Sequence, residues 1–140
     1  MATWQLGPFD NDDAVEWCGA LEDTAPDQRA AFVRHTLEAA ALLGRTLTPE
    51  AAAQAIAAAA TVVQSIAGTP PSSSAYAPRF LLGRDDVQAT SQLRSLATRA
   101  LDTVLAHDSA WRLRWAEDVE EVEAFEVIEE LRITLASGTP

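Results

Sequence analysis

Apolar residues recur every three or four positions along most of the chain, and short stretches rich in Gly, Pro and Asp separate these periodic segments. This spacing is typical of amphipathic helices, and no alternating pattern long enough for a useful strand stands out. We therefore predict an all-α fold, a compact bundle of five or six helices in which residues 1–140 form one domain. The expected helices cover residues 11–23, 27–43, 49–67, 86–107, 109–115 and 122–136, and residues 137–140 are expected to fray.

The segment 49–67 differs from the others because it is nearly uncharged and consists mostly of alanine. Its start is marked by a hydroxyl at Thr48, a proline at position 49 and the acidic Glu50 in the first turn, and Gly68 favours a left-handed end. A helix that is apolar all round either lies inside a core or spans a membrane. Spanning needs about 20 strongly apolar residues, and this run is shorter and interrupted by glutamine and serine. We therefore expect it to be the central helix of the bundle.

Residues 68–86 are predicted to be the main irregular segment, because Pro, Ser and Gly replace the helical spacing there. Loops of this length inside a domain are uncommon and often functional. One interpretation is a binding loop that uses Tyr76 and Arg79 as contacts, and the other is a packed crossover between two helix pairs. Asp85 or Asp86 is expected to cap the helix that follows.

The opening of the chain has the composition of a well-defined helix start. Asp10 is predicted to be the N-cap, with Phe9 packing onto the first turn as a hydrophobic staple. Asp12 and Asp13 then lie in the first turn, where the positive end of the helix dipole favours acidic side chains. The alternative is a metal site using Asp10, Asp12 and Glu16, but the Gly and Glu that an EF-hand loop needs at its sixth and twelfth positions are missing. We therefore favour capping and predict no metal site.

This opening resembles that of the bacterial domain of unknown function 4259 family, whose members begin with a W-x-x-G-P-F-D-N-D-D-A pattern. The similarity extends over nearly the whole chain, through the Ala-rich helix, the Pro-rich loop, the segments 97–106 and 109–115, and a terminal amphipathic helix. The resemblance implies a small single-domain bacterial protein and supplies no activity, substrate or catalytic residue. The matching residues form a structural signature: Trp4, Gly7, Pro8, Phe9, Asp10, Asn11, Asp12, Asp13 and Ala14.

The chain is strongly acidic, with 21 Asp and Glu against 10 Arg, no Lys, and a net charge of −11. This balance argues against nucleic acid or an anionic membrane as a partner, since phosphate binding depends on clustered basic side chains. It favours solubility and attraction to basic partners. The single Cys18 cannot form an internal disulfide, and the N-terminus does not resemble a signal peptide. We therefore expect a cytoplasmic protein.

The densest acidic run precedes Arg132 near the end of the chain. It is either a solvated helix face or a surface that docks a basic protein. The run contains Glu117, Asp118, Glu120, Glu121, Glu123, Glu126, Glu129 and Glu130. The candidate partner-binding residues are Glu117, Asp118, Glu120, Glu121, Glu123, Tyr76 and Arg79.

No catalytic constellation is recognisable in the sequence. There is no nucleophile elbow and no phosphate-binding glycine loop, and Cys18 has no basic neighbour that would activate it. His35 is expected to pair locally with Glu38, and His107 to lie at the negative end of a helix. We predict no catalytic residue and no cofactor.

The leading functional hypothesis is a non-catalytic protein-binding module, of which an immunity- or antitoxin-like protein that covers a basic partner is one form. The first alternative is a small metal- or ligand-dependent enzyme that uses scattered carboxylates and His35. The second alternative is a structural subunit that oligomerises through exposed tryptophans. The sequence leaves the oligomeric state open.

Overall fold

The computed structural model describes residues 8–9, 11–43, 46–68, 77–82, 84, 86–106, 109–116 and 119–137. Within these ranges the chain forms helices and no strand, which confirms the predicted all-α fold. The elements are α1 (Asp12–Asp23), η1 (Pro26–Gln28), α2 (Arg29–Leu43), α3 (Pro49–Ala67), η3 (Arg79–Leu81), α4 (Ser91–Val104), α5 (Ala110–Trp115) and α6 (Glu121–Ser137), where η denotes a short 3-10 helix.

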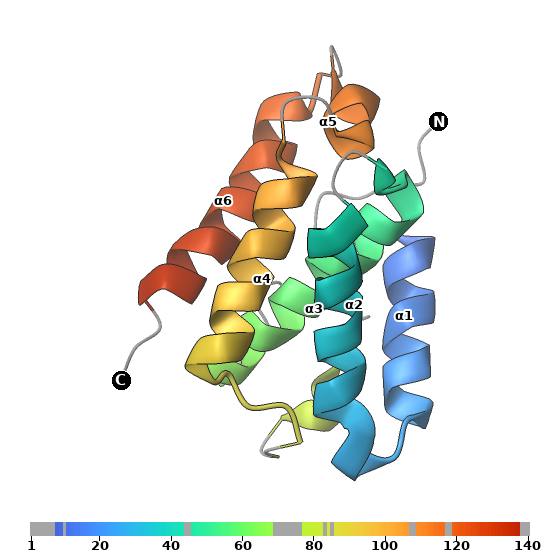
Figure 1. The fold of residues 1–140 in the computed structure, drawn as a ribbon, viewed down its shortest axis with the longest axis vertical. Coiled ribbons are helices and arrows are strands. Elements are labelled where there is room, and N and C mark those ends of the chain that lie inside the picture. Colours follow the sequence, from blue (N-terminus) through green and yellow to red (C-terminus); the bar gives the residue numbers. More distant parts are fainter. Residues whose placement is uncertain are drawn as a thin grey trace.

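The long helices alternate in direction along the chain. In Figure 1, α1 runs downward, α2 upward, α3 downward, α4 upward and α6 downward, and the short α5 lies at the top of the molecule. Helices α2 and α4 therefore run in the same direction, and they pack side by side. Helix α3 lies behind them and contacts α1, α2, α4, α5 and α6. The alanine-rich helix is thus the centre of the bundle, as predicted.

Methyl-sized side chains explain why so many helices reach α3. Twelve of its 19 residues are buried, and most of these are alanines. Short side chains let neighbouring helix axes approach closely. Helix α3 is also long and apolar enough to cross a membrane by length and composition, but 67% of that stretch is buried inside the bundle. Its surroundings in the structure are those of a core helix.

Both predicted ends of α3 are confirmed. The Thr48 hydroxyl accepts a hydrogen bond from the amide of Ala51 at 3.1 Å, and Pro49 occupies the first helical position. At the other end Gly68 adopts a left-handed conformation with φ of 79°, and its amide donates to the carbonyl of Gln64. Local sequence signals therefore define this helix completely.

The start of α1 differs from the prediction by one residue. The N-cap is Asn11 and not Asp10: the Asn11 Oδ1 atom accepts a hydrogen bond from the amide of Ala14 at 2.8 Å. Asp10 itself lies outside the described residues, while Asp12 and Asp13 occupy the first turn as predicted. Asn and Asp are equally good caps, so a run of four such residues leaves the register open.

The prediction that Asp85 or Asp86 caps the next helix is wrong. Helix α4 begins at Ser91, and the Thr90 hydroxyl is its cap, accepting a hydrogen bond from the amide of Leu93 at 3.1 Å. Asp86 is held by two arginines instead, as described below, and Asp85 lies outside the described residues. The irregular segment therefore extends four residues beyond Asp86 and includes the short helix η3.

An aromatic cluster joins α5 to α6. The ring of Trp111 lies 6.3 Å from Trp115 and 5.6 Å from Phe125, centroid to centroid. Trp111 and Trp17 are buried and Trp115 is half-buried, while Trp4 is outside the described residues. The three described tryptophans therefore belong to the interior, which argues against an oligomer held together by exposed tryptophans.

Two glycines predict opposite effects of the same substitution. Gly19 lies inside α1 with no atom within 4 Å of an added methyl group, so Gly19→Ala should stabilise the protein by about 0.5–1 kcal/mol. Gly68→Ala should destabilise it by about 1–2 kcal/mol, because an L side chain is strained at φ of 79° even without a clash. Urea unfolding of both variants checks the pair, and changes of the same sign would contradict it.

Candidate functional site

The most connected polar residue in the interior is Arg29, the first residue of α2. Its Nε donates to the carbonyl of Leu21 at 3.2 Å and its Nη2 to the carbonyl of Glu22 at 2.7 Å. Its Nη1 bonds Asp86 Oδ2 at 2.8 Å, and its guanidinium lies 4.9 Å from the centre of the Phe80 ring. One side chain thus satisfies the last carbonyls of α1 and connects them to the irregular segment.

Asp86 accepts from two arginines at once. The same Oδ2 atom that binds Arg29 also binds Arg84 Nε at 2.9 Å, and the Asp86 side chain is 9% exposed. The hydrogen bond from Arg84 and then that from Arg29 lower the pKa of Asp86 below its ordinary value. Asp86 therefore stays ionised, and it ties the irregular segment to the end of α1.

The described residues of the predicted acidic surface lie just before α6 and in its first turn. Glu120 and Glu123 are exposed and Glu121 is half-buried, whereas Glu117 and Asp118 lie outside the described residues. In Figure 1 this end of α6 stands next to α5 at the top of the molecule.

The solvent side of α6 carries apolar as well as acidic side chains. Val122 is 65% exposed and Ile133 is 63% exposed, and three exposed glutamates share this side of the helix. A separation of eleven residues brings Val122 and Ile133 to the same face, about 16 Å apart along the helix axis. We name this surface the α6 outer face, made of Val122, Glu123, Glu126, Glu130 and Ile133.

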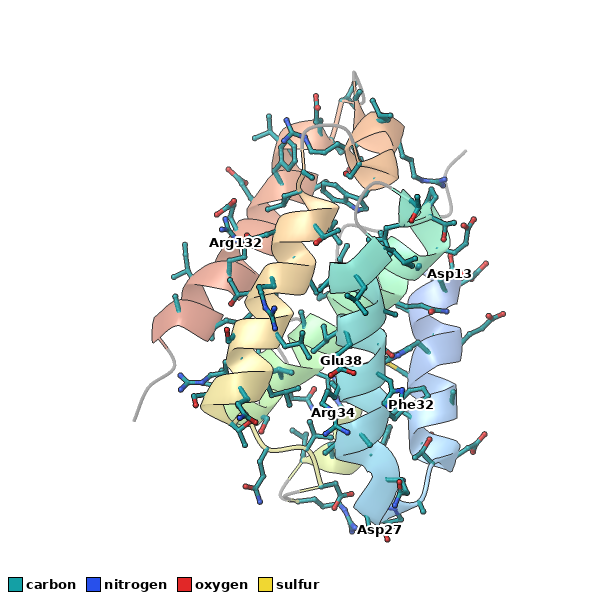
Figure 2. All side chains as sticks on the ribbon, viewed as in Figure 1. Asp13, Asp27, Phe32, Arg34, Glu38 and Arg132 are labelled. Carbon is teal, nitrogen blue, oxygen red and sulfur yellow. The ribbon has the colours of Figure 1, made fainter. Side chains whose placement is uncertain are left out.

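Arg132, the arginine of α6, forms ion pairs with Asp102 and Glu129. Arg132 Nη2 lies 2.7 Å from Asp102 on α4, and its Nη1 lies 3.0 Å from Glu129. Figure 2 shows Arg132 between α6 and α4. The arginine therefore links the two helices, and the charges of Glu123, Glu126 and Glu130 have no matching ion pair among the described residues.

A second surface feature was not predicted from the sequence. An open groove of about 1150 Å³ follows the outer side of the α2–α4 seam and is bordered by the segment before α4. Short side chains leave the space: Ala30 and Ala41 on α2 and Ser91 and Ser95 on α4. The groove is lined by Ala30, Arg34, Glu38, Ala41, Leu42, Asp86, Gln88, Thr90, Ser91, Gln92, Leu93, Ser95, Leu96 and Arg99.

Two arginines border this groove from opposite helices. On α2, Arg34 Nε lies 3.9 Å from Glu38, and both side chains are about half exposed. Figure 2 shows Arg34 and Glu38 on the side of α2 toward α4, with Phe32 on the side toward α1. On α4, Arg99 is exposed and makes no ion pair with any described residue. Glu38 thus lies beside Arg34, while its expected partner His35 is exposed on α2.

The remaining candidate residues are dispersed. Arg79 is exposed at the start of η3, and Tyr76, its expected companion in a binding loop, lies outside the described residues, as does His107. Cys18 is buried in the core, where desolvation raises the pKa of its thiol to about 12. In this environment Cys18 packs as a small apolar residue.

The carboxylates and histidines of the described ranges form no group of three or more close enough to hold a metal ion. On α1, Asp12 and Asp13 act in the first turn of the helix, with Pro8 and the fully buried Phe9 preceding them. The N-terminal signature therefore has a structural role in the part of it that the structure describes.

The chain belongs to a family of proteins defined by a domain of unknown function, DUF4259, whose model matches residues 2–126. The match covers the bundle from the N-terminal signature to the first turns of α6. This match confirms the family that the sequence resembles. Neither a curated protein nor a solved structure matches the chain.

Replacing Asp86 should make stability depend less on acid pH. Asp86→Asn should lower the free energy of unfolding at pH 7, because the amide loses the charge attraction of Arg84 and Arg29. Since the folded pKa lies below the ordinary 3.8, the contribution of Asp86 is complete above that value and disappears as pH falls through the lowered pKa. Urea unfolding at pH 7 and pH 3 should show the difference between variant and wild type shrinking in acid.

The exposed Asp27→Asn provides the control for this experiment. It removes one carboxylate near the same end of the molecule and should change little at either pH. A deficit of Asp86→Asn that is as large at pH 3 as at pH 7 would contradict the assigned role.

The thiol of Cys18 should be unreactive in the folded protein. A pKa of about 12 instead of 9.0 lowers the thiolate fraction at pH 8 by roughly a thousandfold, and burial blocks access as well. Reaction with a disulfide reagent such as DTNB should be slow in buffer. In about 6 M guanidinium, which unfolds the protein, it should be complete within the mixing time. Equal rates in the two conditions would show that the thiol is accessible.

Proposed function

We propose that this protein is a non-catalytic protein-binding module that binds a basic protein through the α6 outer face. The observation that supports this most is the exposure of Val122 and Ile133 between glutamates that have no counter-charge among the described residues. A face that served solubility alone needs the carboxylates but gains nothing from exposed branched apolar side chains.

The two types of side chain have separate roles in such an interface. Apolar residues that lose water at the centre supply affinity, and charged residues around them supply orientation and a faster encounter. Glu123, Glu126 and Glu130 would attract a partner rich in Lys or Arg, and attraction of this kind weakens as salt is added. Leu113 on α5 and Val119 before the start of α6 are also exposed, at 65% and 95%.

An immunity- or antitoxin-like protein that covers a basic partner is one form of this proposal. The cytoplasm is the compartment we propose, and the single buried free thiol of Cys18 is compatible with it. A neighbouring gene for a small basic toxin would support this form directly.

Charge reversal tests the proposal. Wild-type protein and the triple variant Glu123→Lys, Glu126→Lys, Glu130→Lys are used as baits in lysate of the source organism, at low salt and at about 0.5 M salt. We expect the wild type to retain a basic protein at low salt, to release it at high salt, and the triple variant to retain none of it. The purified partner should then bind the wild type with a dissociation constant at least roughly a hundredfold lower than that of the triple variant.

A matched control separates local from overall charge. Glu16→Lys, Glu22→Lys and Asp27→Lys change the net charge by the same amount at exposed positions of α1 and η1. This variant should still bind the partner. The proposal would be wrong if both triple variants lost the partner equally, or if the wild type retained no basic protein at low salt.

A further inference from the structure

The groove between α2 and α4 has the construction of a docking site and is separate from the α6 outer face. Its apolar floor comes from Ala30 and Ala41 on one helix and Leu93 and Leu96 on the other. Leu42, which lines one end of the groove, is 86% exposed.

The dimensions favour a helical segment over a small molecule. From Ala30 to Leu42 the α2 side of the groove is about 18 Å long, or slightly more than three helical turns. Small-molecule sites are typically enclosed clefts of roughly 300–1000 Å³, whereas this groove is larger, at about 1150 Å³, and open along its length. An open groove between two helices, with apolar residues in its floor and polar residues along its walls, is the shape that receives an amphipathic helix.

Two arginines and two carboxylates line the groove, and the charge that is left without an ion pair there is positive. Asp86 is already matched by Arg29 and Arg84, and Glu38 lies beside Arg34. Arg99 then remains without an ion pair among the described residues. The unmatched charge in the groove lining is thus a guanidinium, although the net charge of the chain is −11.

The positions of the two exposed arginines indicate where a segment bound in the groove would place its carboxylates. Arg34 extends from α2 between the two alanines, and Arg99 extends from α4 one turn beyond Ser95. A helix lying in the trough with its apolar side down presents its two flanks to these two walls. Carboxylates on both flanks would each meet a guanidinium, which binds carboxylates with paired hydrogen bonds.

We propose that the α2–α4 groove binds an acidic amphipathic helix of a partner protein, with Arg34 and Arg99 holding carboxylates on its two flanks. This site gives the protein a second binding surface, of opposite charge preference to the α6 outer face. The proposal does not depend on the function assigned to that face.

A pair of designed peptides tests the proposal with the full-length protein. The first is a fluorescent 16-residue helix (about four and a half turns at about 3.6 residues per turn) with leucines on one side and glutamates on both flanks, and the second has glutamine in place of every glutamate. Fluorescence anisotropy should show binding of the glutamate peptide and at least roughly tenfold weaker binding of the glutamine peptide. Arg34→Glu with Arg99→Glu should weaken binding by roughly tenfold or more, because charged hydrogen bonds are lost at both walls.

Two further variants make the result specific to the groove. Ala41→Phe fills the floor without changing charge and should also reduce binding, while Arg114→Glu, an exposed position on α5 outside the groove, should leave it unchanged. Thermal unfolding confirms that each variant is folded. Failure of the glutamate peptide to bind at millimolar concentration, equal binding of the two peptides, or full binding by the Arg34→Glu, Arg99→Glu variant would each overturn the proposal.

Discussion

The arrangement of this bundle depends on a buried guanidinium at the start of α2. Arg29 bonds two carbonyls at the end of α1, and it bonds a carboxylate that lies 57 residues further along the chain. A helix end leaves its last carbonyls without partners, and a buried arginine without a counter-charge is strongly unfavourable. The guanidinium of Arg29 donates to the unpaired carbonyls at the end of α1, and Asp86 supplies its counter-charge. The α1–α2 corner and the segment before α4 are therefore fixed in a single step, and Phe80 covers the guanidinium.

This constraint determines where the groove forms. Because Asp86 is held against Arg29 and Arg84, it is unavailable as a helix cap, and the chain stays irregular until Thr90. Helix α4 then starts beside the lower half of α2 and runs parallel to it, and small residues of both helices line the groove between them. Longer side chains at Ala30 or Ser95 would fill the trough. The contacts of Arg29 thus help to shape the groove, although Arg29 itself does not line it.

The sequence predicts those features whose signals are local. The hydroxyl, proline and acid at residues 48–50 and the glycine at 68 define both ends of α3. The buried residues of α6, Ala124, Ile128, Leu131 and Leu135, recur at helical spacing in the sequence. The two capping errors have different causes. At the start of α1 four adjacent residues are all good caps, whereas at Asp86 a distant arginine overrides the local preference. The acidic character of α6 is visible in the sequence. The exposure of Val122 and Ile133 depends on helix packing that no local pattern encodes. The same holds for the positions of Arg34 and Arg99 in the lining of one groove.

The distribution of charge has a consequence for how both surfaces interact with partners. The net charge of −11 repels acidic molecules at long range, so an acidic helix reaches the groove against the overall field and is attracted only within about one Debye length of its arginines. A basic partner of the α6 outer face is steered by the whole molecule. Added salt therefore strongly weakens the association of a basic partner with the α6 outer face. For an acidic helix at the groove, salt has opposing effects, since it screens both the long-range repulsion and the short-range attraction. Salt dependence of the association rate consequently distinguishes the two surfaces, even where their affinities are equal.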